Sequence, residues 1–340
     1  MKRIIALVLV VMLALVMLAA CDSTDTASTD QGGTGTDSNQ TNNTGNNSTN
    51  DTASNNSNSQ NQDTGSTADN SGTQDTNDAP TSNFDNTRYV SVVTREEGSG
   101  TRDAMRDLFD IRDADGRENV TLEAIVADGT GVMITNVAND PYAIGYCSLA
   151  SLNDTVRALD IDGVEPTVEN VKNGSYAIQR PFYLATMGDA DGLAADFIHF
   201  ILSSEGQEAT TRRCIPAIDN APAYSGSRPS GKIVVGGSSS VSPVMEDLIA
   251  AYAIINPNAE IELQVSDSTN GMNDAKSGVY DIGMASREVR EAEVADGLVP
   301  IFIAIDGIAV IVNSSNPLTA LSREQVRSIY NGETERWSET

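Results

Sequence analysis

The sequence has few of the residues that metal sites and most hydrolases need. Its 340 residues include one histidine, His199, three cysteines and one tryptophan. Zinc sites need several His or Cys ligands, and a Ser-His-Asp triad needs a histidine base, so both are disfavoured. No Gly-x-Ser-x-Gly motif surrounds Ser99. In a helix, His199 would lie opposite Phe197, which indicates an exposed side chain. We expect no metal, no cofactor and no enzymatic activity.

Positive charge is also scarce. The chain carries 21 Lys and Arg against 48 Asp and Glu, a formal net charge of −27 at pH 7. Ten of the acidic residues lie in 22–86, and 38 acidic and 19 basic residues remain after that segment. A negative surface of this kind disfavours nucleic acid and anionic membrane surfaces as partners. Any anion that this protein binds must therefore be held by local dipoles and a few arginines.

The N-terminus contains the long apolar run of the chain. Lys2 and Arg3 precede Ile4–Met17, and Leu-Ala-Ala-Cys21 follows. A charged start, a short apolar core and small residues are typical of an export signal, and the run is marginal for the roughly 20 residues that span a bilayer. The tetrad resembles the bacterial lipobox. That resemblance implies a signal peptide over 1–20 and a lipid, with palmitate among its acyl chains, on Cys21. An ordinary signal followed by a chance cysteine is the alternative.

The segment after the signal is of low complexity. Residues 22–86 are almost all Ser, Thr, Asn, Asp, Gln and Gly, a composition that cannot bury enough apolar surface to fold. We expect 21–86 to be a disordered tether. The remaining chain is long enough for one large or two small lobes. It holds Cys147 and Cys214, and export permits a disulfide, but the two positions leave the pairing open.

Three later segments share one design, in which a strand runs into a Ser/Thr/Gly loop that opens a helix. The predicted strands are 89–94, 232–235 and 261–265, and the loops that follow are 95–101, 236–243 and 266–271. Glycine lets a backbone approach a ligand closely, and helix N-termini offer N–H groups and positive dipole ends. Helix capping explains any single loop of this kind. Three together predict a site for a tetrahedral oxyanion, with Arg95 as a two-pronged donor.

These residues resemble a known family, the Pst-type phosphate-binding lipoproteins of ABC importers. Arg95-x-x-Gly-Ser-Gly-Thr101 resembles the family's second-lobe phosphate motif, and Gly-Ser-Ser-Ser-Val241 with Pro243 resembles its amino-terminal loop. Asp-Ile-Gly-Met-Ala-Ser-Arg287 resembles a further ligand segment. The resemblance covers nearly all of 88–340. It implies an α/β fold of the two-lobed periplasmic-binding-protein type, in which each lobe is a twisted mixed sheet flanked by helices and the ligand lies in the cleft between them.

The resemblance also implies the phosphate-binding residues, with Val241 acting through its backbone N–H. They are Arg95, Ser99, Gly100, Thr101, Ser239, Ser240, Val241, Ser268, Ser286 and Arg287. One type of family member has an Asp, which accepts the proton of phosphate, where this chain has Ser286-Arg287. Asp267 and Asp306 are candidates for that role here. Glu97 is the candidate to orient Arg95.

The order of the motifs is unusual for the family, because the segment that resembles the family's start follows at 231. Joining Thr340 to about Thr87 restores the usual order, so we expect a circular permutant whose old termini meet near 225–231. Two partial copies, 88–229 and 231–340, are the alternative. The expected lobes are 87–183 with 306–340, and 184–305, with crossings near 181–185 and 304–308.

The sequence thus predicts a monomeric solute-binding protein, lipid-anchored to the outer face of a bacterial cell membrane. Its predicted partners are inorganic phosphate, the permease subunits of an ABC importer and, through the lipid, the membrane. Another tetrahedral oxyanion such as sulfate or molybdate is an alternative ligand. A surface adhesion or interaction module of the same fold is an alternative function. An enzyme built on the Ser-rich loops would lack an evident base.

Overall fold

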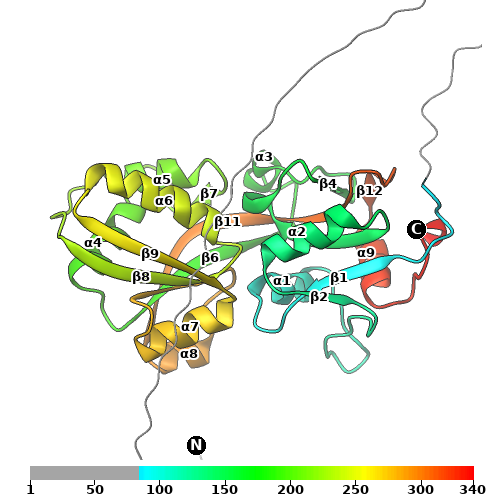
Figure 1. Ribbon diagram of the computed structural model, residues 1–340, viewed down its shortest axis with the longest axis horizontal. Helices are drawn as coiled ribbons and strands as arrows, with labels where there is room; N and C mark the ends of the chain where they lie inside the picture. Colours follow the sequence, from blue (N-terminus) through cyan, green and yellow to red (C-terminus); the bar gives the residue numbers. More distant parts are fainter. Residues whose placement is uncertain (1–83) are drawn as a thin grey trace, which may run out of the picture. The chain divides into compact units, whose positions relative to one another are not determined.

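The computed structural model describes residues 84–340, so the predicted signal peptide, Cys21 and nearly all of the tether lie outside the described residues. The described chain alternates strands and helices, which confirms the predicted α/β class (Figure 1). The strands are β1 (Ser91–Arg95), β2 (Ile125–Ala127), β3 (Ala143–Ser148), β4 (Val156–Ala158), β5 (Asp160–Ile161), β6 (Gln179–Met187), β7 (Ile215–Pro216), β8 (Gly231–Ser238), β9 (Ala259–Ser266), β10 (Ile282–Ala285), β11 (Leu298–Asn313) and β12 (Ala320–Leu321).

The helices lie between these strands. They are α1 (Gly100–Leu108), α2 (Thr130–Asn139), η1 (Leu149–Ser151), α3 (Val168–Lys172), α4 (Gly192–Ile201), α5 (Ser204–Thr210), α6 (Ser242–Ile255), α7 (Ser268–Ser277), α8 (Glu291–Ala295), α9 (Arg323–Tyr330) and η2 (Trp337–Glu339). In Figure 1, α5 and α6 lie above β8 and β9, whereas α7 and α8 lie below them. The sheet is therefore covered on both faces in this part of the molecule.

One mixed sheet runs through the described chain. Its strand order is β2-β1-β3-β11-β6-β10-β8-β9, and β4 and β7 also pair with β11. The pairs at the two ends, β1 with β2 and β3, and β8 with β9 and β10, are parallel. The central pairs of β11 with β3 and β6 are antiparallel. Helices follow the carboxyl ends of the parallel strands, which is where α/β proteins place their binding loops.

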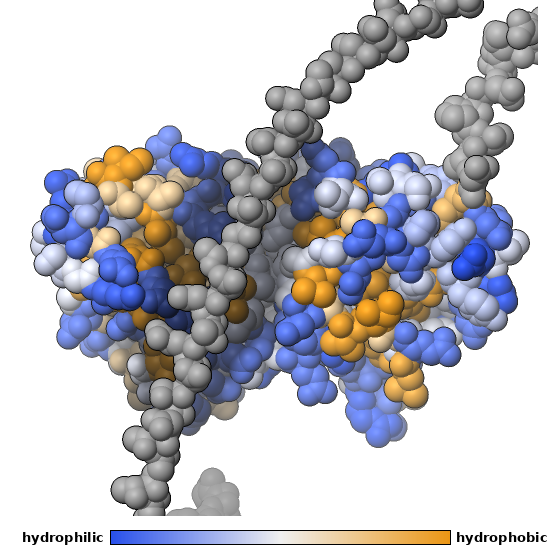
Figure 2. All heavy atoms as spheres, viewed as in Figure 1, coloured by the Kyte–Doolittle hydropathy of each residue, from blue (hydrophilic) through white to orange (hydrophobic). Residues whose placement is uncertain are grey.

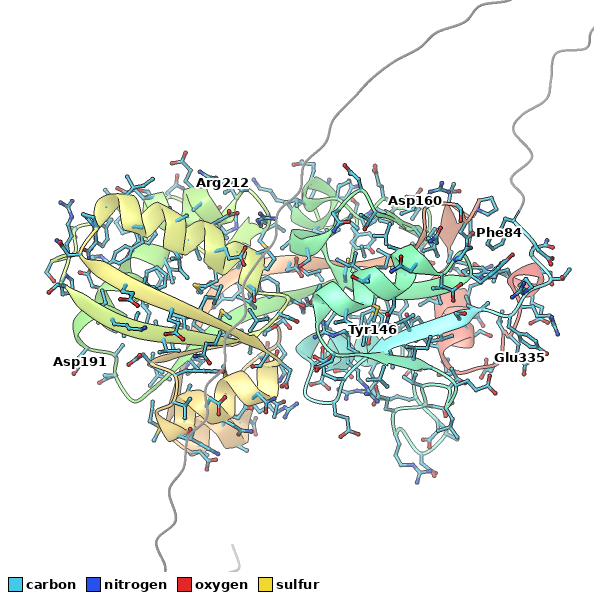
Figure 3. The ribbon with its side chains drawn as sticks, viewed as in Figure 1. Phe84, Tyr146, Asp160, Asp191, Arg212 and Glu335 are labelled. Carbon is cyan, nitrogen blue, oxygen red and sulfur yellow. The ribbon has the colours of Figure 1, made fainter. Side chains whose placement is uncertain are left out.

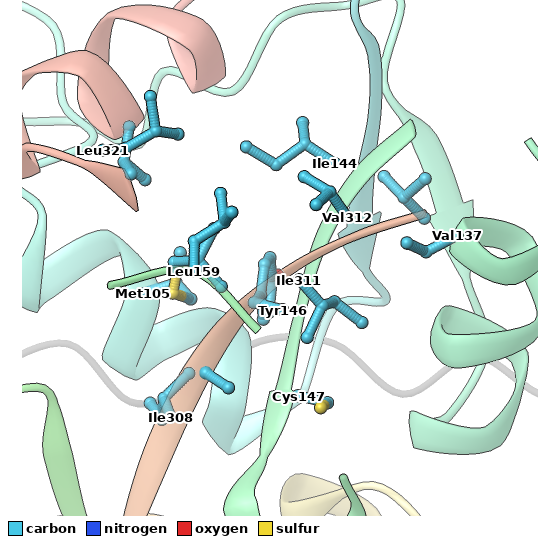
Figure 4. Close-up of a cluster of buried hydrophobic side chains, with 14 of the residues drawn as sticks. Met105, Val137, Ile144, Tyr146, Cys147, Leu159, Ile308, Ile311, Val312 and Leu321 are labelled. Carbon is cyan, nitrogen blue, oxygen red and sulfur yellow. The ribbon is translucent and has the colours of Figure 1, made fainter. Parts of the chain in front are cut away.

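The buried apolar residues form two main clusters. The first lies among residues 92–178 and 308–337, and part of it is shown in Figure 4, including Met105, Tyr146 and Ile311. The second lies among residues 182–304, together with Ala150. We name the elements around the first cluster the β1 half and those around the second the β8 half. Each half has its own core, which is the usual mark of a compact unit.

Two long strands join the halves. β6 and β11 pair along their length, with Leu298 opposite Met187 at one end and Gly307 opposite Gln179 at the other. Arg180 and Asp306 face each other near the middle of the molecule, and their side chains are 3.2 Å apart and fully buried. The chain thus passes from one half to the other through paired backbone rather than through loops.

The local predictions from the sequence hold in the described chain. β8 and β9 cover the predicted strands, β1 begins two residues later than predicted, and α1, α6 and α7 follow these strands. Pro243 lies in the first turn of α6, where its missing N–H costs nothing. Gly278 ends α7 in the left-handed conformation with φ 77°, which a residue with a Cβ rarely adopts.

Both ends of the described chain belong to the β1 half. Phe84 packs against Tyr142 and Trp337 at ring-centroid distances of 5.1 and 6.0 Å, and Tyr89 forms a β-bridge with Arg336. The cyan start and the red end of the ribbon lie close together in Figure 1. The described chain therefore begins and ends at the same side of the same half.

The structure also shows the state of the two cysteines, the exposure of His199 and the position of exposed apolar side chains. Cys147 and Cys214 are both buried free thiols, so they do not form a disulfide. His199 is exposed, as predicted. Apolar side chains are exposed near the edge strand β2, where Ile125 and Val126 face solvent (Figure 2). Among residues 84–340, no helix has the length and apolar character needed to cross a membrane.

Candidate functional site

Arg95 lies at the end of β1 and is 2% exposed. Its backbone N–H donates to the hydroxyl of Tyr146, 3.0 Å away, which lies on the neighbouring strand β3 (Figure 3). Its Nε and Nη2 donate to the two carboxylate oxygens of Glu96 at 2.7 and 2.6 Å. Nη1 donates to Thr130 Oγ1 at 3.0 Å, and Nη2 also reaches Ser239 Oγ at 3.1 Å. One edge of the guanidinium is thus hydrogen-bonded to Glu96, and the other edge faces the hydroxyls of Thr130 and Ser239.

Four hydroxyls from both halves meet at that edge. Thr101 Oγ1 lies 2.9 Å from Ser240 Oγ, and Thr130 Oγ1 lies 3.1 Å from the same atom. Ser239 Oγ lies 3.1 Å from Thr130 Oγ1 and accepts the backbone N–H of Thr130 at 3.1 Å. Thr101 and Thr130 open helices of the β1 half, and the two serines precede α6 of the β8 half. Each hydroxyl can donate or accept, so the group can turn its protons toward an anion.

A second pair of hydroxyls, those of Ser268 and Ser286, lies next to Gly100, the residue before Thr101. The backbone N–H of Ser286 donates to Ser268 Oγ at 3.0 Å, and the two hydroxyls are 3.3 Å apart. A methyl group at position 100 would lie 2.7 Å from Ser268 Oγ and 2.8 Å from Ser286 Oγ. Only glycine permits this approach of α1 to the β8 half. The N–H groups of Gly100 and Thr101, the first two residues of α1, have no partner within the helix, so they are available at this place.

Two of the predicted phosphate-binding residues use their polar atoms for hydrogen bonds to nearby residues of the chain. Ser99 is the N-cap of α1, and its hydroxyl accepts the N–H of Arg102 at 3.3 Å. The Val241 N–H, predicted as a ligand donor, donates to the carbonyl of Ser238 at 3.0 Å, and its side chain is buried in the second cluster. Both residues adjoin the hydroxyl group, and in this structure their polar atoms hold the loops in shape.

Arg287 is placed differently from the other nine predicted residues. Its Nη1 and Nη2 donate to the carboxylate of Glu293 at 2.9 and 2.8 Å. Its Nε lies 3.9 Å from an oxygen of Asp103, across the boundary between the halves. Arg287 is 8% exposed, and its hydrogen bonds go to Glu293, the Thr269 hydroxyl and the carbonyl of Glu288 rather than to the hydroxyls at Arg95.

The carboxylate that orients Arg95 is Glu96, and the hypothesis that Glu97 does so is wrong. Glu97 is exposed, whereas Glu96 makes both hydrogen bonds to Arg95 and also accepts the N–H of Gly129 at 3.1 Å. Burial alone would raise the pKa of Glu96, but the hydrogen bonds and charge of Arg95 hold it below its ordinary value. Glu96 follows the last residue of β1, where the chain leaves the extended conformation for a turn, so the alternation of side chains along a strand does not decide which glutamate meets Arg95.

Asp267 and Asp306, the two candidate proton acceptors, have other partners in the structure. Asp267 caps α7, with Oδ1 accepting the N–H groups of Thr269 and Asn270 at 2.7 and 2.9 Å. Asp306 faces Arg180, and burial raises its pKa to about 6 despite that neighbour. Among residues 84–340, neither carboxylate hydrogen-bonds to the hydroxyls at the edge of Arg95.

Sequence reasoning missed Thr130 and chose the wrong glutamate. A signal for Thr130 was present, because Gly129-Thr130-Gly131 follows a strand and opens α2, the same design as the three loops that were identified. The strand before it has only three residues, two of them exposed. Such a short strand gives no periodic pattern to find.

Comparisons with known proteins show which family the chain belongs to. The model of a family described as "PBP superfamily domain" matches residues 74–205 and 222–340. A curated protein from Streptococcus agalactiae, named phosphate-binding protein PstS 2, is 44% identical over 255 residues, 74% of this chain and 87% of its own. The phosphate-binding protein PstS of Bacillus subtilis is 35% identical over 112 residues, 37% of its length.

A solved structure matches over the same extent. It is that of the phosphate-binding protein of a phosphate ABC transporter from Streptococcus pneumoniae TIGR4, with a TM-score of 0.58 and 36% sequence identity. The match covers 74% of this chain and 99% of that one. The described residues therefore correspond to a whole binding protein of that kind, which confirms the predicted fold.

Proposed function

Because the chain belongs to the PBP superfamily domain family and aligns over most of its length with phosphate-binding PstS 2 proteins, we propose that it captures inorganic phosphate outside the cytoplasm and hands it to an ABC importer. The observation that carries the proposal is the meeting of Arg95 with hydroxyls from both halves. A tetrahedral oxyanion needs donors on several sides, and a site built from two facing halves supplies them.

The donors suit an anion although the protein is strongly acidic. Arg95 shares its charge with Glu96, so the pair adds little net charge to the site. Hydroxyl and backbone N–H groups supply the rest, and hydrogen bonds to a charged acceptor are stronger than those between neutral groups. The hydroxyls now contact one another, and phosphate would replace these contacts when it binds.

Calorimetric titration tests the proposal. Phosphate is expected to bind the purified residues 84–340, and Arg95→Ala and Ser268→Ala are expected to abolish tight binding with the fold intact by circular dichroism. Ser277→Ala is the matched control, because Ser277 lies on the same helix as Ser268 but is exposed and bonds only within α7. Wild-type affinity in either site variant would refute the assignment of these residues to the phosphate site. Tighter binding of sulfate, arsenate or molybdate than of phosphate would mean that the protein's ligand is that anion.

The proposal treats the two halves as lobes that close on phosphate by hinge motion of β6 and β11. The predicted lobes, 87–183 with 306–340 and 184–305, divide the chain within these two strands. The separate cores of the halves support this division. Small-angle scattering with and without phosphate tests it, since a closing protein becomes more compact.

We also propose the circularly permuted order. The Bacillus subtilis relative matches over 112 residues only, whereas the Streptococcus agalactiae relative matches over 255. A chain that is permuted relative to the first and collinear with the second would give this pattern. Superposition on a phosphate-binding protein of the usual order, with strand correspondences followed through the sequence, tests the proposal.

The remaining parts of the proposal concern the membrane. Cys21 would carry the lipid, residues 21–86 would be the tether, and the permease subunits would receive phosphate from a monomeric protein at the outer face of the cell membrane. The Leu-Ala-Ala-Cys21 sequence supports the anchor. Palmitate labelling of cells that make the full chain tests it, and unlabelled protein would refute it.

A further inference from the structure

An ion cluster joins the two halves beside the proposed site. Asp103 lies on α1, in the β1 half, and its Oδ2 accepts a hydrogen bond from Arg290 Nη2 of the β8 half at 3.0 Å. The Nε of Arg287, also in the β8 half, is 3.9 Å from the same oxygen. Asp103 follows Thr101 by two residues, and Arg287 follows Ser286 directly. Any movement that separates the site residues therefore also separates these charges.

Asp103 and Arg287 are held in place from their own halves. Arg106 Nη1 donates to Asp103 Oδ1 at 2.9 Å on the same helix. Glu293 holds the Arg287 guanidinium by two hydrogen bonds and accepts the backbone N–H of Arg290 at 2.7 Å. Burial alone would raise the pKa of Glu293, but its hydrogen bonds to Arg287 and Arg290 and their charges together hold that pKa below its ordinary value. The Arg287 side chain is thus fixed by its own half, whereas the Arg290 side chain has Asp103 as its ion-pair partner.

The contacts of Arg287 are incomplete. Its Nε is buried and lacks a hydrogen-bond partner among the described residues. The 3.9 Å separation from Asp103 is about 1 Å too long for a hydrogen bond. A small further approach of the halves would supply the missing partner, and a buried donor without one is costly.

We propose that Asp103, Arg287 and Arg290 form a latch that stabilises the closed state and so sets how long phosphate stays bound. The inference rests on the proposed function. It assigns Arg287 to the latch and not to the ligand. Because the latch lies outside the proposed phosphate-binding hydroxyls, it acts on the equilibrium between open and closed forms. A ligand released only from the open form then leaves more slowly when the closed form is favoured.

The latch is tested with Asp103→Asn, which keeps the size of the side chain and removes its charge. The phosphate dissociation rate is measured by stopped flow against an excess of a fluorescent phosphate sensor. We expect it to rise about three- to tenfold, as for loss of a partly exposed charge contact of roughly 1 kcal/mol. The association rate is expected to stay within about twofold, because Asp103 is not a ligand.

Asp107→Asn is the matched control. Asp107 lies on the same helix, and its ion pairs with Arg106 and Arg112 stay within the β1 half. It is expected to change the dissociation rate by less than about twofold. A double-mutant cycle of Asp103→Asn with Arg290→Gln is expected to give a coupled effect, since the two residues act on each other.

The outcomes separate this inference from the proposed function. If wild-type protein binds no phosphate by calorimetry, the proposed function fails. If phosphate binds and Asp103→Asn dissociates at the wild-type rate, the latch is rejected and the proposed function stands. If Asp107→Asn accelerates dissociation equally, the effect comes from the overall charge of α1 and the latch is also rejected.

Discussion

At the scale of single residues, Glu96 determines how Arg95 is presented. It occupies Nε and Nη2 on one edge of the guanidinium, which leaves the other edge for Thr130 and Ser239. A buried arginine without such a partner would bear the full cost of desolvation. The Glu96 carboxylate therefore makes it possible to bury the Arg95 cation at this site. The ligand would then accept hydrogen bonds from the edge of the guanidinium that Glu96 leaves free.

Gly100 gives a prediction at the same scale. A methyl group at position 100 would lie under 3 Å from the hydroxyls of Ser268 and Ser286, so Gly100→Ala keeps the halves apart. We expect phosphate affinity to fall by about a hundredfold or more. Stability is expected to stay equal or to rise by up to about 1 kcal/mol, because Ala is the better helix former. Calorimetry and urea unfolding measure the two effects.

Gly131 provides the control for that variant. It lies in the first turn of α2, and a methyl group there would meet nothing within 4 Å. Gly131→Ala is expected to leave phosphate affinity within about twofold. Equal losses in both variants would mean that the close approach at Gly100 has no part in binding.

At the scale of the elements, the strand-to-helix loops could be predicted from the sequence, but the contacts between the loops of the two halves could not. Alternating residues mark β1 and β9, Pro243 marks the start of α6, and Gly278 marks the end of α7. Such signals are local. The contact of Thr130 with Ser239 depends on two halves far apart in sequence, and the choice between Glu96 and Glu97 depends on how the chain turns after the end of β1. Neither is encoded in a local pattern, and the family resemblance supplied the pairing of loops that the residues alone did not.

The two joining strands give the prediction for the elements. Burial raises the pKa of Asp306 to about 6 and lowers that of Arg180, so the fold disfavours the charged form of both. The folded state therefore binds the proton of Asp306 more tightly than the unfolded state does. This carboxyl makes the free energy of unfolding fall as pH rises from about 4 to about 6, by at most about 3 kcal/mol.

Urea unfolding between pH 4.5 and 7 measures that fall, with the double variant Arg180→Met, Asp306→Leu as the reference. The other acidic residues also titrate, so the difference between the two proteins is the quantity of interest. Replacing both members of a buried pair is often tolerated, whereas removing one is costly. A difference that does not change with pH would contradict the raised pKa of Asp306.

At the scale of the whole molecule, the net charge of −27 opposes the approach of an anion. Salt screens this long-range repulsion. We therefore expect the association rate of phosphate to rise about two- to fivefold as ionic strength increases from about 20 to about 300 mM. Stopped-flow binding measures the rate. A rate that falls with salt would show that the local positive ends of the helices outweigh the charge of the rest of the surface.

The packing of Phe84 against Tyr142 and Trp337 fixes where the preceding chain is attached. Everything before Phe84 is joined to the β1 half, close to the last residue, Thr340. If that chain is the flexible tether proposed above, it holds on to one half alone, so movement of the β8 half relative to the β1 half puts no strain on the attachment. The link to the membrane and the opening of the proposed site would then be mechanically independent.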